Sequence, residues 1–131
     1  MNPDLLKKWL VALVKANTAI NVTGQIYPDE APDGTSNPCV VYQYLGAEFE
    51  VNMASTLDDA SHAIQCRIYA DTRSEADQLR ADLAERLLGA CGETIASGVV
   101  LEHTEIDNFA DTFDPDDGSY GATFVWTAIN S

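Results

Sequence analysis

The sequence predicts an α+β fold, an antiparallel β-sheet with two helices packed on one face, in the order α-β-β-β-α-β-β with an extended β-hairpin. Two segments repeat apolar residues at the three-and-four spacing of amphipathic helices. Five other segments are rich in the β-branched and aromatic residues that favour strands. Because consecutive strands usually pair, we expect one antiparallel sheet and a single domain spanning residues 1–131.

The first helix is expected to run from Pro3 to about Ala16. Asn2 is a suitable N-cap, and proline at the first helical position loses no useful N–H group. A short strand, "QIYP", follows, and then a surface loop over residues 28–38, where three prolines and a glycine exclude regular structure. The helix has one apolar face, which a sheet or a partner must cover: Leu6, Trp9, Leu10, Leu13 and Val14.

The extended hairpin is expected from the segment "CVVYQYLGAEFEV" and a second strand from His62 to Ala70. The first strand continues to Val51, with Gly46 as a bulge position. Turn residues separate the two strands. The second strand alternates like a half-buried strand, and its apolar face consists of Ile64, Cys66, Ile68 and Ala70.

The second helix is expected to begin after Thr72, which has capping-box spacing to Glu75, and to end at Gly89 or Gly92. Two strands then complete the sheet, "GVVLEHTEI" and "YGATFVWTAI". The residues "DPDDG" before the last strand favour a turn. The apolar stripe of this helix consists of Ala76, Leu79, Leu83, Leu87 and Ala90.

The charge balance is unusual, because 7 Lys and Arg stand against 21 Asp and Glu, a formal net charge of −14 at pH 7. This field repels phosphates and the basic residues form no patch, so a function of gripping nucleic acid is disfavoured. The amino terminus lacks the signal-peptide pattern and no apolar run is long enough to span a bilayer, so no membrane partner is expected. The cysteines have neither zinc nor Cys-x-x-Cys spacing and are expected to be small buried residues: Cys39, Cys66 and Cys91.

No motif favours catalysis. An EF-hand counted from Asp114 would have Gly118 at its fifth position and Val125 at its twelfth, although the acidic turn leaves room for a weak calcium site. His103 and Glu105 have the His-x-Glu spacing of zinc deaminases, but no Pro-Cys-x-x-Cys follows. We expect them on an exposed polar face beside a buried Val100. No catalytic residue, cofactor or metal is therefore expected.

Apolar residues at the end of the first hairpin strand are candidates for contact with another protein. Phe49, Val51 and Met53 alternate where the strand outruns the rest of the domain, and Tyr44 lies earlier on the same strand. The alternative is that these residues close the small core, because alternation does not separate burial within a chain from burial between chains.

Three segments together resemble the tail completion or tail terminator proteins of long-tailed phages and prophages: "QIYPDEAPDGTSNPCVVYQ", "AIQCRIYADTRSEADQLRADLAERL" and "DTFDPDDGSYGATFVWTA". These proteins share an Ile-Tyr-Pro strand, an Ala-Pro loop, a Pro-x-Val-x-Tyr-Gln strand, a helix of repeated Ala and Leu, and a closing Asp-Pro-x-x-Gly-x-Tyr hairpin. The same order covers residues 1 to 130 here. The resemblance is carried by the order and spacing of all the pieces.

The resemblance implies a structural virion protein without enzymatic activity. Such proteins form a ring, hexameric in the lambda-type relatives, that docks on the last ring of the tail tube, stops tube growth and offers a surface to the head connector. Related particles include gene transfer agents. The implied partners are copies of the chain itself, the tail tube protein and a head-tail connector or stopper protein. The implied location is the virion tail or neck, after assembly in the cytoplasm of the bacterial host. The hairpin at residues 46–61 is our first choice for subunit or tube contact, and the loop at 28–38 the second.

In such a ring the negative charge of the chain could act on the DNA that passes through the channel. Six copies would carry on the order of −80 charges, and DNA passing through the lumen carries one phosphate charge about every 1.7 Å. An acidic wall would not retain DNA, which is then only a transient cargo. The alternative is that these carboxylates lie outside and serve solubility. The candidates for an acidic channel are Asp29, Glu30, Asp33, Asp107, Asp111, Asp114, Asp116 and Asp117.

Three alternatives stay open at this point. A head-side stopper or adaptor protein of the phage neck fits nearly the same sequence features. An acidic decoy that mimics DNA predicts a monomer or dimer that captures a basic host protein. A small hydrolase would need a convergent cluster of His or Cys with carboxylates, which the spacing does not suggest.

Overall fold

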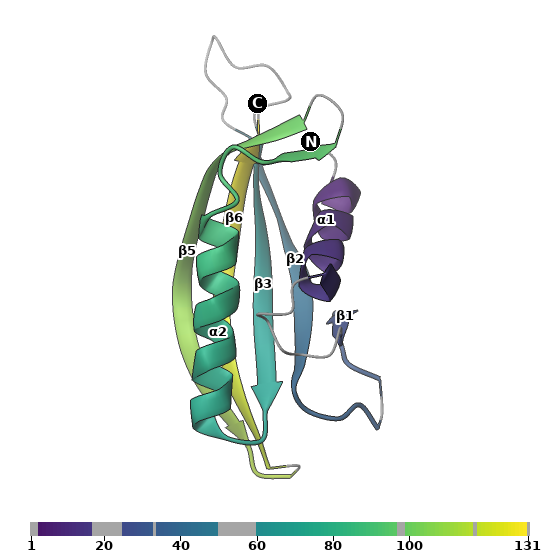
Figure 1. Ribbon diagram of the computed structural model, residues 1–131, viewed down its shortest axis with the longest axis vertical. Helices are drawn as coiled ribbons and strands as arrows, with labels where there is room; N and C mark the ends of the chain where they lie inside the picture. The colour runs from purple at the N-terminus through teal and green to yellow at the C-terminus, as the bar shows by residue number, and fades with distance from the viewer. Residues whose placement is uncertain are drawn as a thin grey trace.

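The computed structural model describes residues 3–16, 25–32, 34–49, 60–96, 99–116 and 118–130, which form an α+β fold (Figure 1). Two helices accompany a six-stranded sheet in which most neighbours are antiparallel. The helices are α1 (Pro3–Ala16) and α2 (Arg73–Leu88). The strands are β1 (Ile26–Pro28), β2 (Cys39–Phe49), β3 (Ala60–Ala70), β4 (Thr94–Ala96), β5 (Val99–Asp114) and β6 (Ser119–Asn130).

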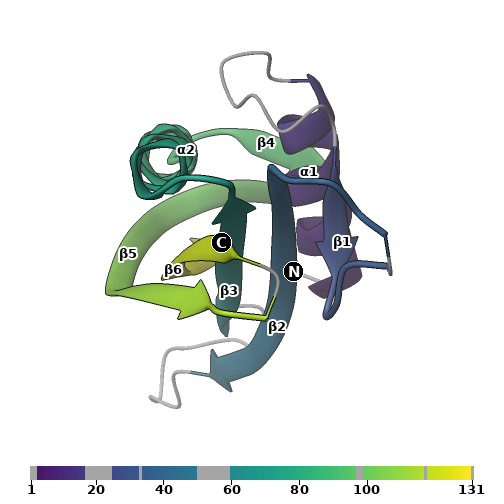
Figure 2. The same cartoon turned by 90° about the horizontal axis from the view of Figure 1, so that it is seen from below.

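The sheet has the strand order β1-β2-β3-β6-β5-β4 and is strongly curled. Viewed along the strands, β5 bends around β6, and its carboxyl end passes beneath β6 and β3 (Figure 2). The long strands run along the longest axis of the molecule (Figure 1). One edge is formed by β1 and the exposed part of β2, and the other by β5, since the three residues of β4 pair only with the first residues of β5.

Both helices pack on the same face of the sheet, as the two apolar stripes predict. Leu6 and Leu10 of α1 and Leu83 and Leu87 of α2 are fully buried in one cluster. Trp126 of β6 lies in the same cluster, and its ring stacks on that of Trp9 with a centroid distance of 5.7 Å. The sheet contributes buried residues from five strands to this cluster: Ile26, Val40, Tyr42, Ile64, Cys66, Ile68, Leu101, Phe124, Trp126 and Ala128.

Two local predictions are confirmed by the backbone. The Thr72 hydroxyl accepts a hydrogen bond from the Glu75 N–H at 3.1 Å, so Thr72 is the N-cap of α2. The pairing of β2 with β3 shifts register between Tyr44 and Gly46. Gly46 has φ 129°, which a residue with a side chain rarely adopts, so glycine permits the bulge at this position.

Three features of the sheet differ from the prediction. Strand β4 was not expected, and β1 pairs with β2 in parallel because residues 29–38 return the chain to the same end of the sheet. The strand expected at "GVVLEHTEI", residues 98–106, continues as β5 to Asp114, and Pro115 to Gly118, within the expected turn, connect it to β6. Residues 107–114 contain several Asp and Asn, which are uncommon in strands, so the sequence did not predict a strand there. The backbone of these residues nevertheless pairs with β6.

The expectation of three buried cysteines is wrong for one of them. Cys39 and Cys66 are buried, whereas Cys91 is exposed in the turn after α2, where its thiol donates to the Glu102 carbonyl at 3.0 Å. Within the described residues, neither helix is long and apolar enough to cross a membrane.

Candidate functional site

The face of the sheet opposite the helices has no helix over it and is mainly polar. Register places Gln43 opposite Gln65, and Gln65 opposite Val125 of β6. Asp107 lies opposite Val125 on the next strand, so it belongs to this same face. Because the sheet curls, this open face is concave, with β5 bending across its lower end (Figure 2).

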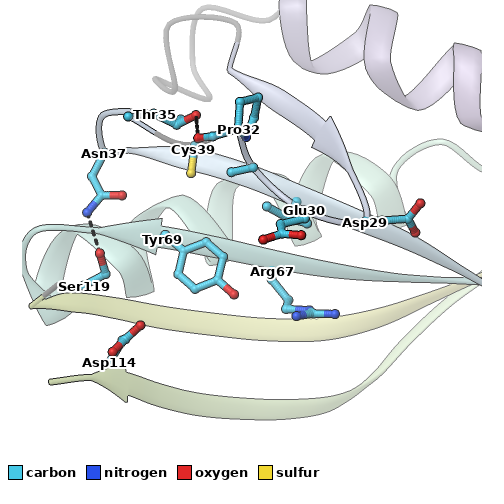
Figure 3. Close-up of a pocket in the computed structure, with 13 residues that line it drawn as sticks. Asp29, Glu30, Pro32, Thr35, Asn37, Cys39, Arg67, Tyr69, Asp114 and Ser119 are labelled. Carbon is cyan, nitrogen blue, oxygen red and sulfur yellow. Dashed lines mark hydrogen bonds between the residues drawn. The ribbon is translucent and has the colours of Figure 1, made fainter. Parts of the chain in front are cut away.

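A pocket of about 340 Å³ lies at that lower end, between the loop after β1 and the hairpin of β5 and β6 (Figure 3). Arg67 and Tyr69 of β3 form part of its wall, and the Arg67 guanidinium donates to the Gln43 side-chain oxygen at 3.0 Å. Asn37 joins the two sides, since its amide donates to the Ser119 hydroxyl at 2.8 Å. Three carboxylates also line the pocket: Asp29, Glu30 and Asp114.

Four of the predicted acidic residues lie near one another at the lower end of the open face. Asp29, Glu30 and Asp114 line the pocket, and Asp116 is exposed in the turn, where its N–H donates to the Asp114 carboxylate at 2.9 Å. Asp107 lies farther along the same face, opposite Val125.

Asp111 differs from the other acidic candidates because it is paired with arginines. Register places it opposite Ala122, on the helix side of the sheet. Its carboxylate lies 2.8 Å from the Arg80 guanidinium and 3.5 Å from that of Arg73, and Asp77 of α2 contacts the same two arginines. This cluster of two cations and two anions is locally neutral, in contrast to the chain as a whole.

Two exposed aromatic residues flank Asp111 on the same face of β5. Phe109 is 58% exposed and Phe113 is 53% exposed. The Arg80 guanidinium lies 5.6 Å from the centre of the Phe109 ring, and the Phe113 ring lies 4.8 Å from that of Tyr120. We call the five residues Phe109, Asp111, Phe113, Arg73 and Arg80 the aromatic-arginine strip.

The same arginines donate to backbone carbonyls of the β5–β6 pair. Arg80 donates to the Ala110 carbonyl at 3.0 Å, and Arg73 donates to the Thr112 carbonyl at 2.6 Å and to the Gly121 carbonyl of β6 at 2.8 Å. These bonds attach α2 to the β5–β6 hairpin.

Sequence reasoning missed the aromatic-arginine strip. The signal was the alternation in "FADTF", which has the two-residue period of a strand. The pairing with Arg73 and Arg80 brings together residues at least 30 positions apart, so no local pattern could reveal it.

The predicted contact residues on β2 are only partly described. Tyr44 is half-buried against α1, where Lys7 lies 5.2 Å from the centre of its ring. Its hydroxyl forms a 2.7 Å hydrogen bond with Nδ1 of the buried His62, a partner that the sequence did not reveal, and burial raises the Tyr44 pKa. The Phe49 side chain lies outside the described residues, as do Val51, Met53, Asp33 and Asp117.

The His-x-Glu pair lies on the surface. His103 Nε2 is 2.8 Å from the Glu105 carboxylate, and both side chains are exposed. The buried neighbour is Leu101 and not Val100 as predicted, because the pairing with β6 shifts register between Leu101 and His103. Within the described part of the chain, no group of three or more His, Cys, Asp and Glu side chains could hold a metal ion.

Comparison with protein families matches residues 8–130 to the family "Tail completion protein gp17". The chain belongs to this family. Among curated protein sequences, no relative matches it. Among solved structures, a chain from the "Virion of native gene transfer agent (GTA) particle" has a similar fold, with 13% sequence identity and a TM-score of 0.69, covering 95% of this chain and 93% of that one.

Family membership fixes the class of function. A tail completion protein is a structural component of a virion tail and not an enzyme. The exposed side chains of His103 and Glu105 contact each other at the surface.

Proposed function

We propose that this tail completion protein forms a ring at the head-proximal end of a phage-type tail tube, ends tube polymerisation and offers the surface to which the head joins. The observation that carries the proposal is the family match over residues 8–130. Assembly takes place in the bacterial host cytoplasm, with the tail tube protein on one side of the ring and a head-side connector or stopper on the other. As in the lambda-type relatives, we expect six copies.

The hairpin at residues 46–61, with Tyr44, Phe49, Val51 and Met53, is the first proposed contact with the tube or a neighbouring subunit.

In the proposed ring the strands run along the ring axis, the helices face outward and the open face lines the channel. Asp107 and Asp114 would then face the DNA, with Asp116 at the rim. A lumen with these carboxylates repels phosphates and keeps DNA from adhering. Asp111 contributes little to this field, because Arg73 and Arg80 neutralise it.

Deletion of the gene tests the terminating role. We expect particles without this protein to accumulate headless tails with tubes of uncontrolled length, because nothing ends tube growth. Electron micrographs measure tail length and the fraction of joined heads. Tails of normal length joined to heads would contradict the proposal. Tails of normal length that fail to join heads would instead assign the protein to the head-side stopper role.

The acidic channel has a separate test. Asp107→Asn with Asp114→Asn should slow DNA ejection, and the effect should be larger at low salt, where phosphates are screened least. The control carries Asp4→Asn with Glu85→Gln, which remove two exposed charges from the helices. Equal ejection rates in the two variants at every salt concentration would place the carboxylates outside the lumen.

A further inference from the structure

The aromatic-arginine strip has the composition of an interface centre. Arg and aromatic residues are enriched among the residues that carry most of the binding energy in protein interfaces. Phe109 and Phe113 remain more than half exposed although each packs one side against a ring of β6. Arg80 is only 17% exposed and held by Ala110, Asp111 and Asp77, so its position is fixed before any partner arrives.

The opposite edge of the sheet presents a fixed proline-rich turn, residues 28–32, with the sequence "PDEAP". The Asp29 N–H donates to the Tyr42 carbonyl at 2.8 Å, and the Glu30 N–H donates to the Pro28 carbonyl at 2.6 Å. Pro28 and Pro32 are exposed at the two ends of this turn. A turn held by its own backbone hydrogen bonds loses little conformational entropy when it binds a partner.

The two surfaces lie at the same height on the sheet. Register links Pro28 to Tyr42, Tyr42 to Cys66, and Cys66 to Phe124. The Phe124 ring lies 6.3 Å from that of Phe109. One continuous row across the strands therefore runs from the turn at one edge to the strip at the other, and Figure 2 shows β1 and β5 on opposite sides of the molecule.

In a ring with rotational symmetry, surfaces at the same height along the axis can contact each other between neighbouring subunits. In a ring of identical subunits, rotation about the axis moves an atom around the axis without changing its height, so contacts between neighbours join surfaces at the same height. When the strands run along the axis, residues 28–32 of one copy face the strip of the next. Different surfaces of the two copies then meet, and such a head-to-tail contact forms a ring when its rotation closes.

Charge also selects these surfaces. Two chains of formal charge −14 repel each other, and at the strip the two arginines balance Asp77 and Asp111. The partly exposed guanidiniums of Arg73 and Arg80 can face Asp29 and Glu30 of a second copy. A neutral strip opposite a turn with two carboxylates meets less repulsion than two acidic surfaces would.

We infer that residues 28–32 of one copy dock on the aromatic-arginine strip of the next and that this is a subunit contact of the ring. The inference rests on the proposed ring and names its interface. It also assigns Asp29 and Glu30 to the contact between subunits and leaves Asp107, Asp114 and Asp116 for the channel.

Cross-linking in assembled tails tests the contact. A chain with Glu30→Cys and Ala81→Cys, in a Cys91→Ser background, is supplied to particles that lack the gene, and purified tails are treated with a short bismaleimide. Ala81 is exposed one helical turn beyond Asp77, beside the strip. We expect a ladder of linked chains that ends at the copy number of the ring. Each single-cysteine variant should stay monomeric, because a head-to-tail contact never brings two copies of one residue together.

The control pairs Glu30→Cys with Ala12→Cys, which is exposed on α1 and not on the strip. Tails that contain the protein at their ends but yield no ladder from the Glu30 and Ala81 pair would overturn the inference and leave the proposed function intact. Dimers from a single-cysteine variant would overturn it too, because they require a two-fold contact. Absence of the protein from tail ends would overturn the proposed function itself.

A second variant tests the energetics. Phe109→Ser with Phe113→Ser should reduce the amount of protein retained on tail ends about tenfold or more. Leu88→Ser is the matched control, because this leucine is similarly exposed, at 48%, and lies outside both the strip and the hairpin proposed to contact the tube. Equal retention of the two variants, once circular dichroism shows both folded, would overturn the inference.

Discussion

At the scale of single residues, the three cysteines show how tertiary position sets chemistry. Cys66 is fully buried between Ile64 and Ile68, and burial raises the pKa of its thiol to about 12. Cys39 is buried at the start of β2, and Cys91 is exposed. The thiolate is the reactive form, so exposure and pKa together decide which cysteine reacts. The Cys91→Ser background of the cross-linking experiment follows from this.

The raised pKa of Cys66 predicts a loss of stability in alkali. Below pH 9 the thiol is protonated in both folded and unfolded chains. As the pH rises from 9 towards 12 only the unfolded chain loses the proton, so the free energy of unfolding falls. Tyr42 and Tyr44 add to the decline above pH 10, because burial raises their pKa values, with Asp29 and Asp4 also raising that of Tyr42.

Urea unfolding at a series of pH values measures this effect. Cys66→Ala should be less stable than the parent chain at pH 7, because it leaves a cavity, but its stability should fall less steeply between pH 9 and pH 11. Parallel declines in the two chains would show that Cys66 does not titrate differently on folding.

At the scale of elements, the contact between α2 and β5 is the feature that local patterns could not predict. The amphipathic stripe of α2 and its Thr72 cap were readable, because both depend on residues three or four positions apart. The continuation of β5 to Asp114 was not readable, because the acidic residues at 107–114 are tolerated in a strand only when β6 pairs with it and Arg73 and Arg80 compensate Asp111.

Arg80→Lys should loosen this contact. Lysine keeps the charge but not the planar fork that contacts the Ala110 carbonyl and Asp111 together. We expect the free energy of unfolding to fall by about 1–2 kcal/mol and hydrogen exchange to rise at residues 110–112. The matched control is Lys8→Ala, which removes the exposed ion pair with Asp4 and should change stability by less than about 1 kcal/mol. Equal effects of the two substitutions would show that the contacts of Arg80 with the Ala110 carbonyl and Asp111 do not stabilise β5.

At the scale of the whole molecule, the charge of −14 opposes both folding and association. Salt screens this repulsion, so the melting temperature should rise as sodium chloride is increased from low to physiological ionic strength. Glu85→Lys with Glu102→Lys changes the net charge from −14 to −10, and the melting temperature of this variant should depend less on salt. Calorimetry measures the melting temperature of the parent chain and of the variant at each salt concentration. If the melting temperatures of the two chains depend equally on salt, the salt effect arises from specific ion pairs and not from net charge.

By itself the sequence determined the α+β class, the two amphipathic helices, the bulge at Gly46 and the resemblance to tail completion proteins. All of these follow from periodicity, capping and the order of short motifs. Tertiary structure alone decided that β1 joins the sheet in parallel, that Asp111 is neutralised, and that the proline-rich turn and the aromatic-arginine strip share one height on opposite edges. The physical reason is that these features depend on strand register and on contacts between distant residues, which the pairing of β6 with both β3 and β5 creates.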